Sequence, residues 1–109
     1  MAIKANLQID QGADFSTEID VLDEAGNPVD LTGYTGAAQM RKHYTSSTAT
    51  NFTVTIDQFG GSVTLFMSAA TSANVTPGRY VYDCELTSSS NVVSRLVEGI
   101  VTVTPQVTR

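Results

Sequence analysis

The sequence contains no tryptophan, one cysteine and one histidine among its 109 residues. With Cys84 alone, no disulfide can form within the chain, which fits a protein that folds in a reducing cytoplasm. A zinc site built from one cysteine and one histidine would need several carboxylates in addition, so the sequence argues against zinc. Sites that depend on several thiol or imidazole groups are therefore not expected in this chain.

Signals for catalysis are also scarce. His43 lies beside a loop-like segment, and the neighbouring motifs suggest no Ser-His-Asp arrangement. Cys84 alternates with apolar residues, which predicts a buried structural thiol, because a nucleophilic cysteine needs a cationic and accessible site. No glycine-rich phosphate loop is present, since Gly60-Gly61 is typical of a hairpin turn. We expect no enzyme activity and no cofactor, and we interpret two carboxylate pairs as structural: Asp14 with Glu18, and Asp83 with Glu85.

Positive charge and long apolar runs are sparse as well. The net charge is -5, and the six Lys and Arg residues are scattered, with one adjacent pair at Arg41-Lys42. Nucleic acid is therefore not expected as a partner, because phosphates are bound by clustered basic residues. No run approaches the roughly 18 apolar residues of a membrane span, and residues 1–6 lack the apolar core of a signal peptide. We expect a protein that is made in the cytoplasm and leaves it only within a larger assembly.

Negative charge is concentrated in the first third of the chain. Seven of the eleven acidic residues fall between Asp10 and Asp30. Such a region is usually a solvated face that keeps a protein soluble. A docking surface for a basic partner and a calcium site are the alternatives, although the spacing does not match an EF-hand loop. The oxygen ligands of such a calcium site would come from the turn that contains Asp20, Asp23, Glu24, Asn27 and Asp30.

What the sequence does contain is apolar residues at every second position, the period of a half-buried strand. This alternation predicts seven strands, over residues 3–10, 15–22, 35–42, 52–56, 63–67, 80–87 and 92–104. One short helical turn is predicted over residues 68–74, with Ser68 as its N-cap. Seven short strands separated by turns indicate an all-β sandwich or barrel. We expect one domain over residues 1–109, in which residues 103–109 form the end of the last strand and a tail.

Two glycine positions refine this prediction. Gly60-Gly61 lies between two alternating segments and predicts a hairpin that pairs residues 52–56 with residues 63–67. Gly99 lies in the middle of the long last strand, which is apolar on both faces. A glycine inside a strand predicts a bulge or a close approach of another backbone.

Three segments, in this order, carry a resemblance to a known family. They are Gly26-Asn27-Pro28-Val29-Asp30-Leu31-Thr32-Gly33-Tyr34-Thr35 with Ala38-Gln39-Met40-Arg41, then Pro77-Gly78-Arg79-Tyr80-Val81-Tyr82-Asp83 with Glu85-Leu86-Thr87, and then residues 95–103 with Val107-Thr108-Arg109. The chain resembles small virion structural proteins of tailed phages, notably of cyanophage-type myoviruses, and the N-terminal domain of phage upper baseplate proteins. The resemblance implies an immunoglobulin-like antiparallel β-sandwich and carries no catalytic residues.

Two of these motifs have a physical interpretation as corners of the fold. In Asp30-Leu31-Thr32-Gly33-Tyr34, we expect Leu31 and Tyr34 to be buried while Asp30 and Thr32 bind backbone amides. In Pro77-Gly78-Arg79-Tyr80, the tyrosine is placed like the corner tyrosine of sandwich domains. The eight residues that we expect to specify the fold are Asp30, Leu31, Thr32, Gly33, Tyr34, Pro77, Gly78 and Tyr80.

The resemblance implies a virion structural protein that binds other virion proteins. We expect a capsid decoration (cement) subunit, and a tail or baseplate component is the alternative. The partners would be the major capsid protein or tail and baseplate proteins, together with further copies of the chain, without nucleic acid or a membrane. A carbohydrate- or host-surface-binding module is the alternative of another class, in which Tyr34, Tyr44 or Phe66 would stack on sugars.

Overall fold

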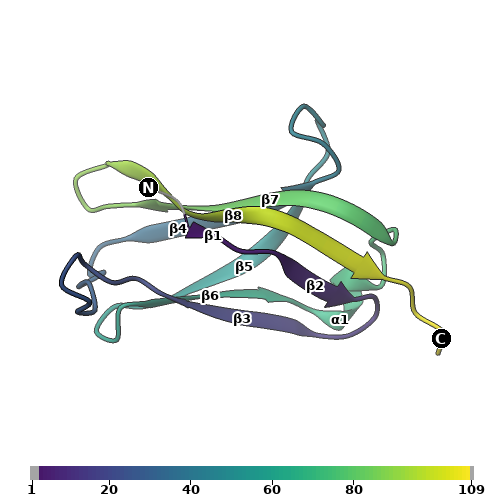
Figure 1. Cartoon of the computed structure of the whole chain (residues 1–109), viewed down its shortest axis with the longest axis horizontal. Helices are drawn as coiled ribbons and strands as arrows, with labels where there is room; N and C mark the ends of the chain where they lie inside the picture. Colours follow the sequence, from purple (N-terminus) through teal and green to yellow (C-terminus); the bar gives the residue numbers. More distant parts are fainter. Residues whose placement is uncertain (1–2, 109) are drawn as a thin grey trace.

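The computed structural model describes residues 3–108 and contains eight β-strands and one short helix in that range (Figure 1). The elements are β1 (Ile3–Lys4), β2 (Leu7–Asp10), β3 (Phe15–Asp20), β4 (Thr35–Arg41), β5 (Thr50–Asp57), β6 (Ser62–Met67), α1 (Ala69–Ser72), β7 (Gly78–Thr87) and β8 (Val93–Thr104). The prediction of an all-β chain with one short helical turn is confirmed. The ends of the expected domain and tail, Met1, Ala2 and Arg109, lie outside the described residues.

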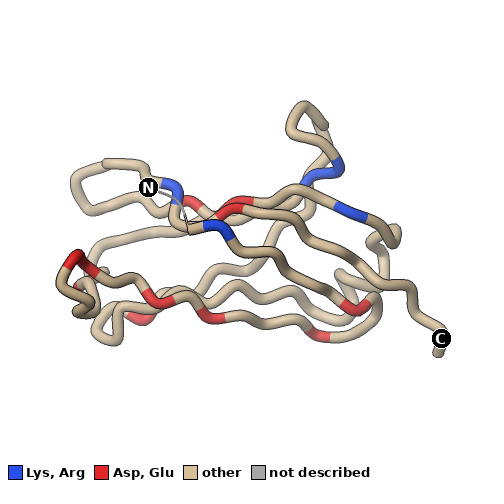
Figure 2. The backbone as a smooth tube through the Cα atoms, viewed as in Figure 1, with Lys and Arg blue, Asp and Glu red and all other residues tan. Residues whose placement is uncertain are grey.

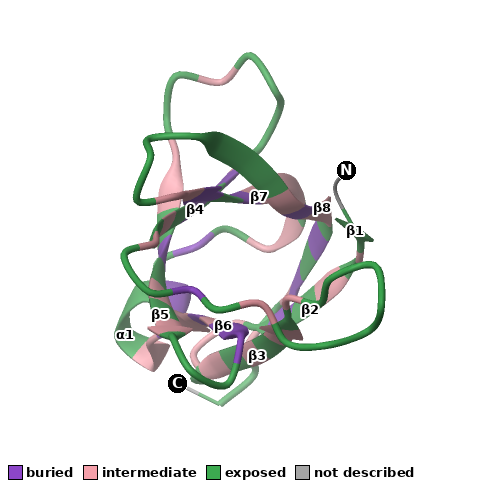
Figure 3. Ribbon diagram, turned by 90° about the vertical axis from the view of Figure 1, so that its left-hand side faces the viewer, coloured by how far each residue is buried: buried purple, intermediate pink, exposed green. Residues whose placement is uncertain are grey.

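All eight strands belong to one curled sheet. Its strands follow the order β1-β8-β7-β4-β5-β6-β3, and β2 also pairs with β8. The sheet curls at β5, because residues 50–52 pair with β4 whereas residues 53–57 pair with β6. Figure 3 shows the strands arranged around a common interior. The result is a half-barrel, and within residues 3–108 no pairing joins β3 to β2.

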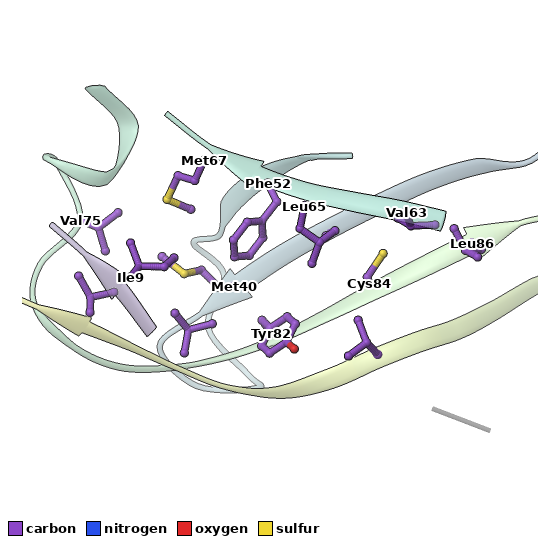
Figure 4. Packing of buried hydrophobic residues seen from close by; sticks show 14 of the residues in the cluster. Ile9, Met40, Phe52, Val63, Leu65, Met67, Val75, Tyr82, Cys84 and Leu86 are labelled. Atoms are coloured by element: carbon purple, nitrogen blue, oxygen red, sulfur yellow. The ribbon is translucent and has the colours of Figure 1, made fainter. Parts of the chain in front are cut away.

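The inward-facing residues of the strands form a single core (Figure 4). Strand β6 is apolar on its inner face at Val63, Leu65 and Met67, which are all fully buried, and β7 contributes Tyr82, Cys84 and Leu86. Burying a side chain of this kind stabilises the fold by about 1.5–3 kcal/mol. The remaining buried apolar residues are Ile9, Leu31, Ala38, Met40, Phe52, Val75, Val97, Val101 and Val103.

The strand predicted over residues 3–10 is interrupted at Ala5 and Asn6, which gives β1 and β2. The Ala5 carbonyl accepts a hydrogen bond from the Tyr82 hydroxyl at 2.6 Å, and Asn6 Oδ1 accepts one from the backbone N–H of Ile100 at 3.1 Å. Both β1 and β2 pair with β8 in parallel. The expectation of an antiparallel arrangement throughout was therefore wrong at this edge, because the first and last strands run in the same direction here.

Gly99 lies where β8 passes closest to the N-terminal segment. A Cβ atom at this position would overlap the carbonyl oxygen of Ala5, so there is space only for a glycine. The predicted close backbone contact at Gly99 is thus confirmed. The pairing of β7 with β8 is irregular at another place, between Cys84 and Glu85. Cys84 faces Val97 but Glu85 faces Arg95, so one residue of β8 is left without a partner. The hairpin predicted at Gly60-Gly61 is also confirmed by the antiparallel pairing of β5 with β6.

Helix α1 begins as predicted after Ser68, whose side-chain oxygen accepts a hydrogen bond from the N–H of Thr71 at 3.2 Å. Ser72, fully buried, joins the helix to the β2–β3 turn: its hydroxyl donates to the Ala13 carbonyl at 2.8 Å and accepts from the Gly12 N–H at 3.0 Å. No helix within residues 3–108 is both long and apolar enough to cross a membrane.

We expect the substitution Gly99→Ala to lower the free energy of unfolding by about 1–3 kcal/mol, because the added methyl group forces the Ala5 backbone away from β8. Chemical denaturation measures this difference. Thr102→Ala, at an exposed position of the same strand, serves as the control and should change the stability by less than about 0.5 kcal/mol. Equal stability of the Gly99 variant and the parent would contradict the close approach.

Candidate contact surfaces

The segment Asp30-Leu31-Thr32-Gly33-Tyr34 forms a tight corner before β4. Asp30 Oδ1 accepts hydrogen bonds from the Thr32 hydroxyl at 2.6 Å and from the Thr32 N–H at 2.9 Å, and these bonds hold the pKa of the Asp30 carboxyl below its usual value. Leu31 is fully buried as predicted, whereas Tyr34 is only half-buried. Gly33 has a φ of 80°, which favours glycine. The expectation that Thr32 binds a backbone amide was wrong, because its hydroxyl donates to Asp30 instead.

The second motif leads into β7 at the opposite end of the molecule. The Tyr80 hydroxyl donates to the carbonyl of Thr76, four residues upstream, at 2.6 Å. The ammonium group of Lys42 lies 5.1 Å from the centre of the Tyr80 ring. Gly78 begins the strand with a φ of 143°, directly after Pro77. The two motifs are not brought together, since Thr35, directly after the first motif, faces Thr87 at the end of β7 opposite to Gly78.

Three loops meet at one end of the molecule, and we call this region the loop end. It consists of residues 21–34, the β5–β6 turn and the β7–β8 turn, which lie together on the left of Figure 1. The N–H of Val21 donates to the Gly61 carbonyl at 2.7 Å, and the N–H of Leu31 donates to the Gln58 carbonyl at 3.1 Å. Gly33 lies so close to Ser89 that a Cβ atom on the glycine would be 2.9 Å from the serine Cβ. These contacts fix the three loops relative to one another.

The loop end presents four large apolar side chains to solvent. Phe59 is 88% exposed, Val92 62%, Val93 59% and Leu22 53%. Single exposed apolar residues are common on protein surfaces, and four of them on neighbouring segments make this end a candidate contact surface. Sequence reasoning missed this group because its members come from three separate loops. The one local signal was a phenylalanine inside the turn Asp57-Gln58-Phe59-Gly60.

The outer face of β4, β7 and β8 carries a shallow depression with mixed charge. It is lined by Gln39, Arg41, Tyr44, Val81, Tyr82, Asp83, Arg95 and Glu98. Arg95 pairs with Asp83 across the strands at 3.4 Å and with Glu98, three residues along the same strand, at 3.2 Å. Exposed pairs of this kind contribute roughly 0–1 kcal/mol to stability. The charged side chains are therefore free to exchange these partners for groups of another protein.

The aromatic residues suggested for sugar binding are not brought together. Tyr44 is 83% exposed and lines the depression. Tyr34 packs against the core near the loop end, and Phe66 lies on β6, which pairs with β3 and β5. Only one of the three therefore lines the depression.

Asp14 and Asp23, two of the carboxylates singled out in the sequence, bind backbone N–H groups of the chain itself. Asp23 Oδ1 accepts the N–H groups of Ala25 and Asn27, both at 2.9 Å, and so closes the acidic turn. Asp14 Oδ1 accepts the N–H of Ala69 at the start of α1, at 2.6 Å. Among the residues that the structure describes, no three His, Cys, Asp or Glu side chains are grouped so that they could hold a metal ion. The acidic turn thus has a local role as a turn cap.

Cys84 and Tyr82 are the titratable groups most affected by the core. Burial raises the pKa of the Cys84 thiol to about 11, and the neighbouring carboxylates of Asp83 and Glu85 add to the effect. Burial also raises the pKa of Tyr82 to about 12. The prediction of a buried structural thiol is confirmed, since Cys84 is fully buried. His43, in contrast, is exposed in the loop after β4.

Comparisons with known proteins bear on the fold. No family model matches the chain, and no curated protein matches it. Among solved structures, the Listeria monocytogenes internalin-like protein lmo2027 is similar over 94% of this chain, with a TM-score of 0.51 and 15% sequence identity. The match spans 28% of the internalin-like chain. At this identity the likeness concerns the fold alone.

We expect Tyr80→Phe to lower the free energy of unfolding by about 1 kcal/mol, because the Thr76 carbonyl loses its hydroxyl donor. For a domain of this size, thermal denaturation should show a melting temperature lower by about 4–8 °C. Tyr44→Phe removes a hydroxyl from an exposed ring and is the matched control, with no measurable change expected. Equal losses in both variants would contradict a role for the Tyr80 hydrogen bond.

The stability of the fold should decrease at alkaline pH. The folded pKa of Cys84, about 11, is higher than its ordinary value of 9.0, so its contribution is complete below pH 9 and is lost as the pH rises to 11. A shift of this size corresponds to on the order of 2 kcal/mol. Denaturant midpoints measured between pH 7 and pH 11 test this, with Cys84→Ala as the comparison. The free energy of unfolding of the variant should fall less over this range than that of the parent. An identical pH dependence of the two proteins would argue against the role of the thiol.

Proposed function

We propose that this chain is a structural subunit of a tailed-phage particle, and that it works by binding other virion proteins through its surface. The resemblance of its sequence to small virion structural proteins supports this proposal. The observation that carries it is the loop end, where large apolar side chains from three loops are exposed on a well-packed framework. Loops held by a rigid scaffold commonly carry binding residues, and burying apolar groups is the main favourable term in protein association.

We further propose that the half-barrel is a variant of the immunoglobulin-like sandwich. In this description β3, β6 and the second half of β5 form one layer, and β1, β2, β8, β7 and β4 form the other. The hydrogen bond from Tyr80 to the backbone four residues upstream supports the proposal, because sandwich domains have a tyrosine corner of this kind. The change of partner along β5 connects the two layers.

Decoration of the capsid is the position that we propose first, and a tail or baseplate position is the second. The partners are then the major capsid protein or tail and baseplate proteins, together with copies of the same chain. A decoration subunit stabilises a shell by bridging neighbouring capsomers in many copies, so individually weak contacts suffice. The chain would be made in the host cytoplasm and then incorporated into the virion. A carbohydrate-binding role has less support, because Tyr34, Tyr44 and Phe66 lie on separate elements.

Imaging of intact particles tests the location. Antibodies against this chain, labelled with gold, should bind over the heads of purified virions. Label confined to the tail tip would reject capsid decoration in favour of the baseplate position. Absence of the chain from purified particles would reject the virion proposal as a whole.

Variants of the loop end test which surface makes the contact. The double substitution Phe59→Ser and Val92→Ser should reduce incorporation into particles by about tenfold or more, because two large apolar groups no longer become buried. Incorporation is measured by quantitative immunoblotting of purified virions. Val107→Ser removes an equally exposed apolar residue near the opposite end of β8 and should have little effect. Equal incorporation of all three proteins would show that another surface makes the contact.

A further inference from the structure

We propose that the free edge of β3 binds an extended segment of a partner protein in which apolar and basic residues alternate. Strand β3 pairs with β6 on one side, and no strand within residues 3–108 pairs with its other side. An unpaired strand edge is a template for a further strand. This inference goes beyond the proposed function, because it concerns a surface apart from the loop end and holds in any assembly that contains the chain.

The register of β3 shows which of its backbone groups are available. The N–H of Val21 donates to the carbonyl of Gly61, which continues the ladder between β3 and β6 by one residue. In an antiparallel ladder, hydrogen-bonded and non-bonded pairs alternate. The odd-numbered residues of β3 therefore bond to β6. The backbone N–H and C=O groups of Ser16, Glu18 and Asp20 point to the open edge, where an added strand could bind them.

Apolar side chains beside this edge are incompletely covered. Phe15, Thr17 and Ile19 point towards the core, yet each is only half-buried. Leu7, on the facing strand β2, is half-buried as well. The cause is the open side of the half-barrel, since no pairing closes it between β2 and β3 within the described residues. A strand added to β3 would cover these side chains if it placed apolar residues on the same, inward side.

The charge around the edge indicates which side chains the partner strand should carry on its outward side. Glu18 and Asp20 are exposed on the outer face of β3, beside Ser16. The sequence has no Lys or Arg from residue 5 to residue 40 or from residue 43 to residue 78, so this layer carries negative charge alone. Figure 2 shows acidic residues along β3 and the loop that follows it, whereas the basic residues lie in the other layer. Lys or Arg at alternate positions of the partner strand would match this surface.

The same charges disfavour a second copy of β3 as the occupant. Antiparallel pairing of two β3 strands about Glu18 would place the two Glu18 side chains directly opposite each other, and pairing about Ile19 would place Glu18 opposite Asp20. Like charges in directly opposite positions are destabilising. The strand otherwise has no proline, lysine or bulge, the features that usually protect an edge, and its register with β6 is continuous over six residues. The acidic residues of β3 are thus the one feature of this strand that disfavours pairing at its edge, and a basic strand would neutralise their charge.

The experiment uses the full chain and a fluorescent peptide of about eight residues in which valine and lysine alternate. Fluorescence anisotropy should show binding that weakens with added salt. Ser16→Pro removes a backbone N–H at the open edge without changing the charge, and it should weaken binding by about tenfold or more. Ser16→Ala keeps this N–H and is the matched control, with affinity close to that of the parent. Thermal denaturation confirms that both variants fold.

Residue-level hydrogen exchange identifies the edge that is used. Peptide binding should slow the exchange of the amide protons of Ser16, Glu18 and Asp20, which face the open edge. A peptide of the same composition in scrambled order should bind about tenfold more weakly, because its apolar residues no longer share one side. The proposal is overturned if both peptides bind equally, if Ser16→Pro binds as well as Ser16→Ala, or if protection appears on another strand. Sedimentation that shows a dimer joined through β3 would also overturn it.

Discussion

The enclosed core of this protein depends on Phe52, at the point where β5 changes its partner. Residues up to Phe52 pair with β4, and residues from Thr53 onwards pair with β6. The ring of Phe52 lies 6.1 Å from that of Phe15 on β3 and 6.2 Å from that of Tyr82 on β7, so one side chain packs against both strands. Because the pairings with β4 and β6 occupy successive parts of β5, the sheet turns from one partner to the other along this strand. The alternating apolar residues of the curled sheet then face one another instead of water.

The curl also determines which parts of the surface remain available. A sheet that closed fully would have no edges. Here β1 and β2 add to β8 in parallel, and β3 remains an edge at the other end of the hydrogen-bonded path. Tyr82 connects this arrangement to the core, since its ring packs against Phe52 and its hydroxyl holds the Ala5 carbonyl beside Gly99. The position of the N-terminal strands is therefore set from inside the core.

Much of this fold follows from local patterns. Alternation located the strands, Ser68 marked the start of α1, and Gly99 indicated a close backbone contact. The change of partner along β5 could not be predicted, because both halves of the strand alternate in the same way. The break at Ala5 and Asn6 depends on Tyr82 and Ile100, which are distant in sequence. The loop end was missed for the same reason, since its contacts exist only after three loops have folded together.

The surfaces of the molecule differ in the chemistry of the partners that they suit. The loop end is apolar, the depression on β4, β7 and β8 has paired charges, and the edge of β3 is acidic with free backbone groups. Contacts of such different character cannot substitute for one another, so each can select its own partner. They also point in different directions from a framework that the core holds rigid. In the proposed virion role, surfaces of this kind would let one subunit join several neighbours at once, as a protein that connects parts of an assembly requires.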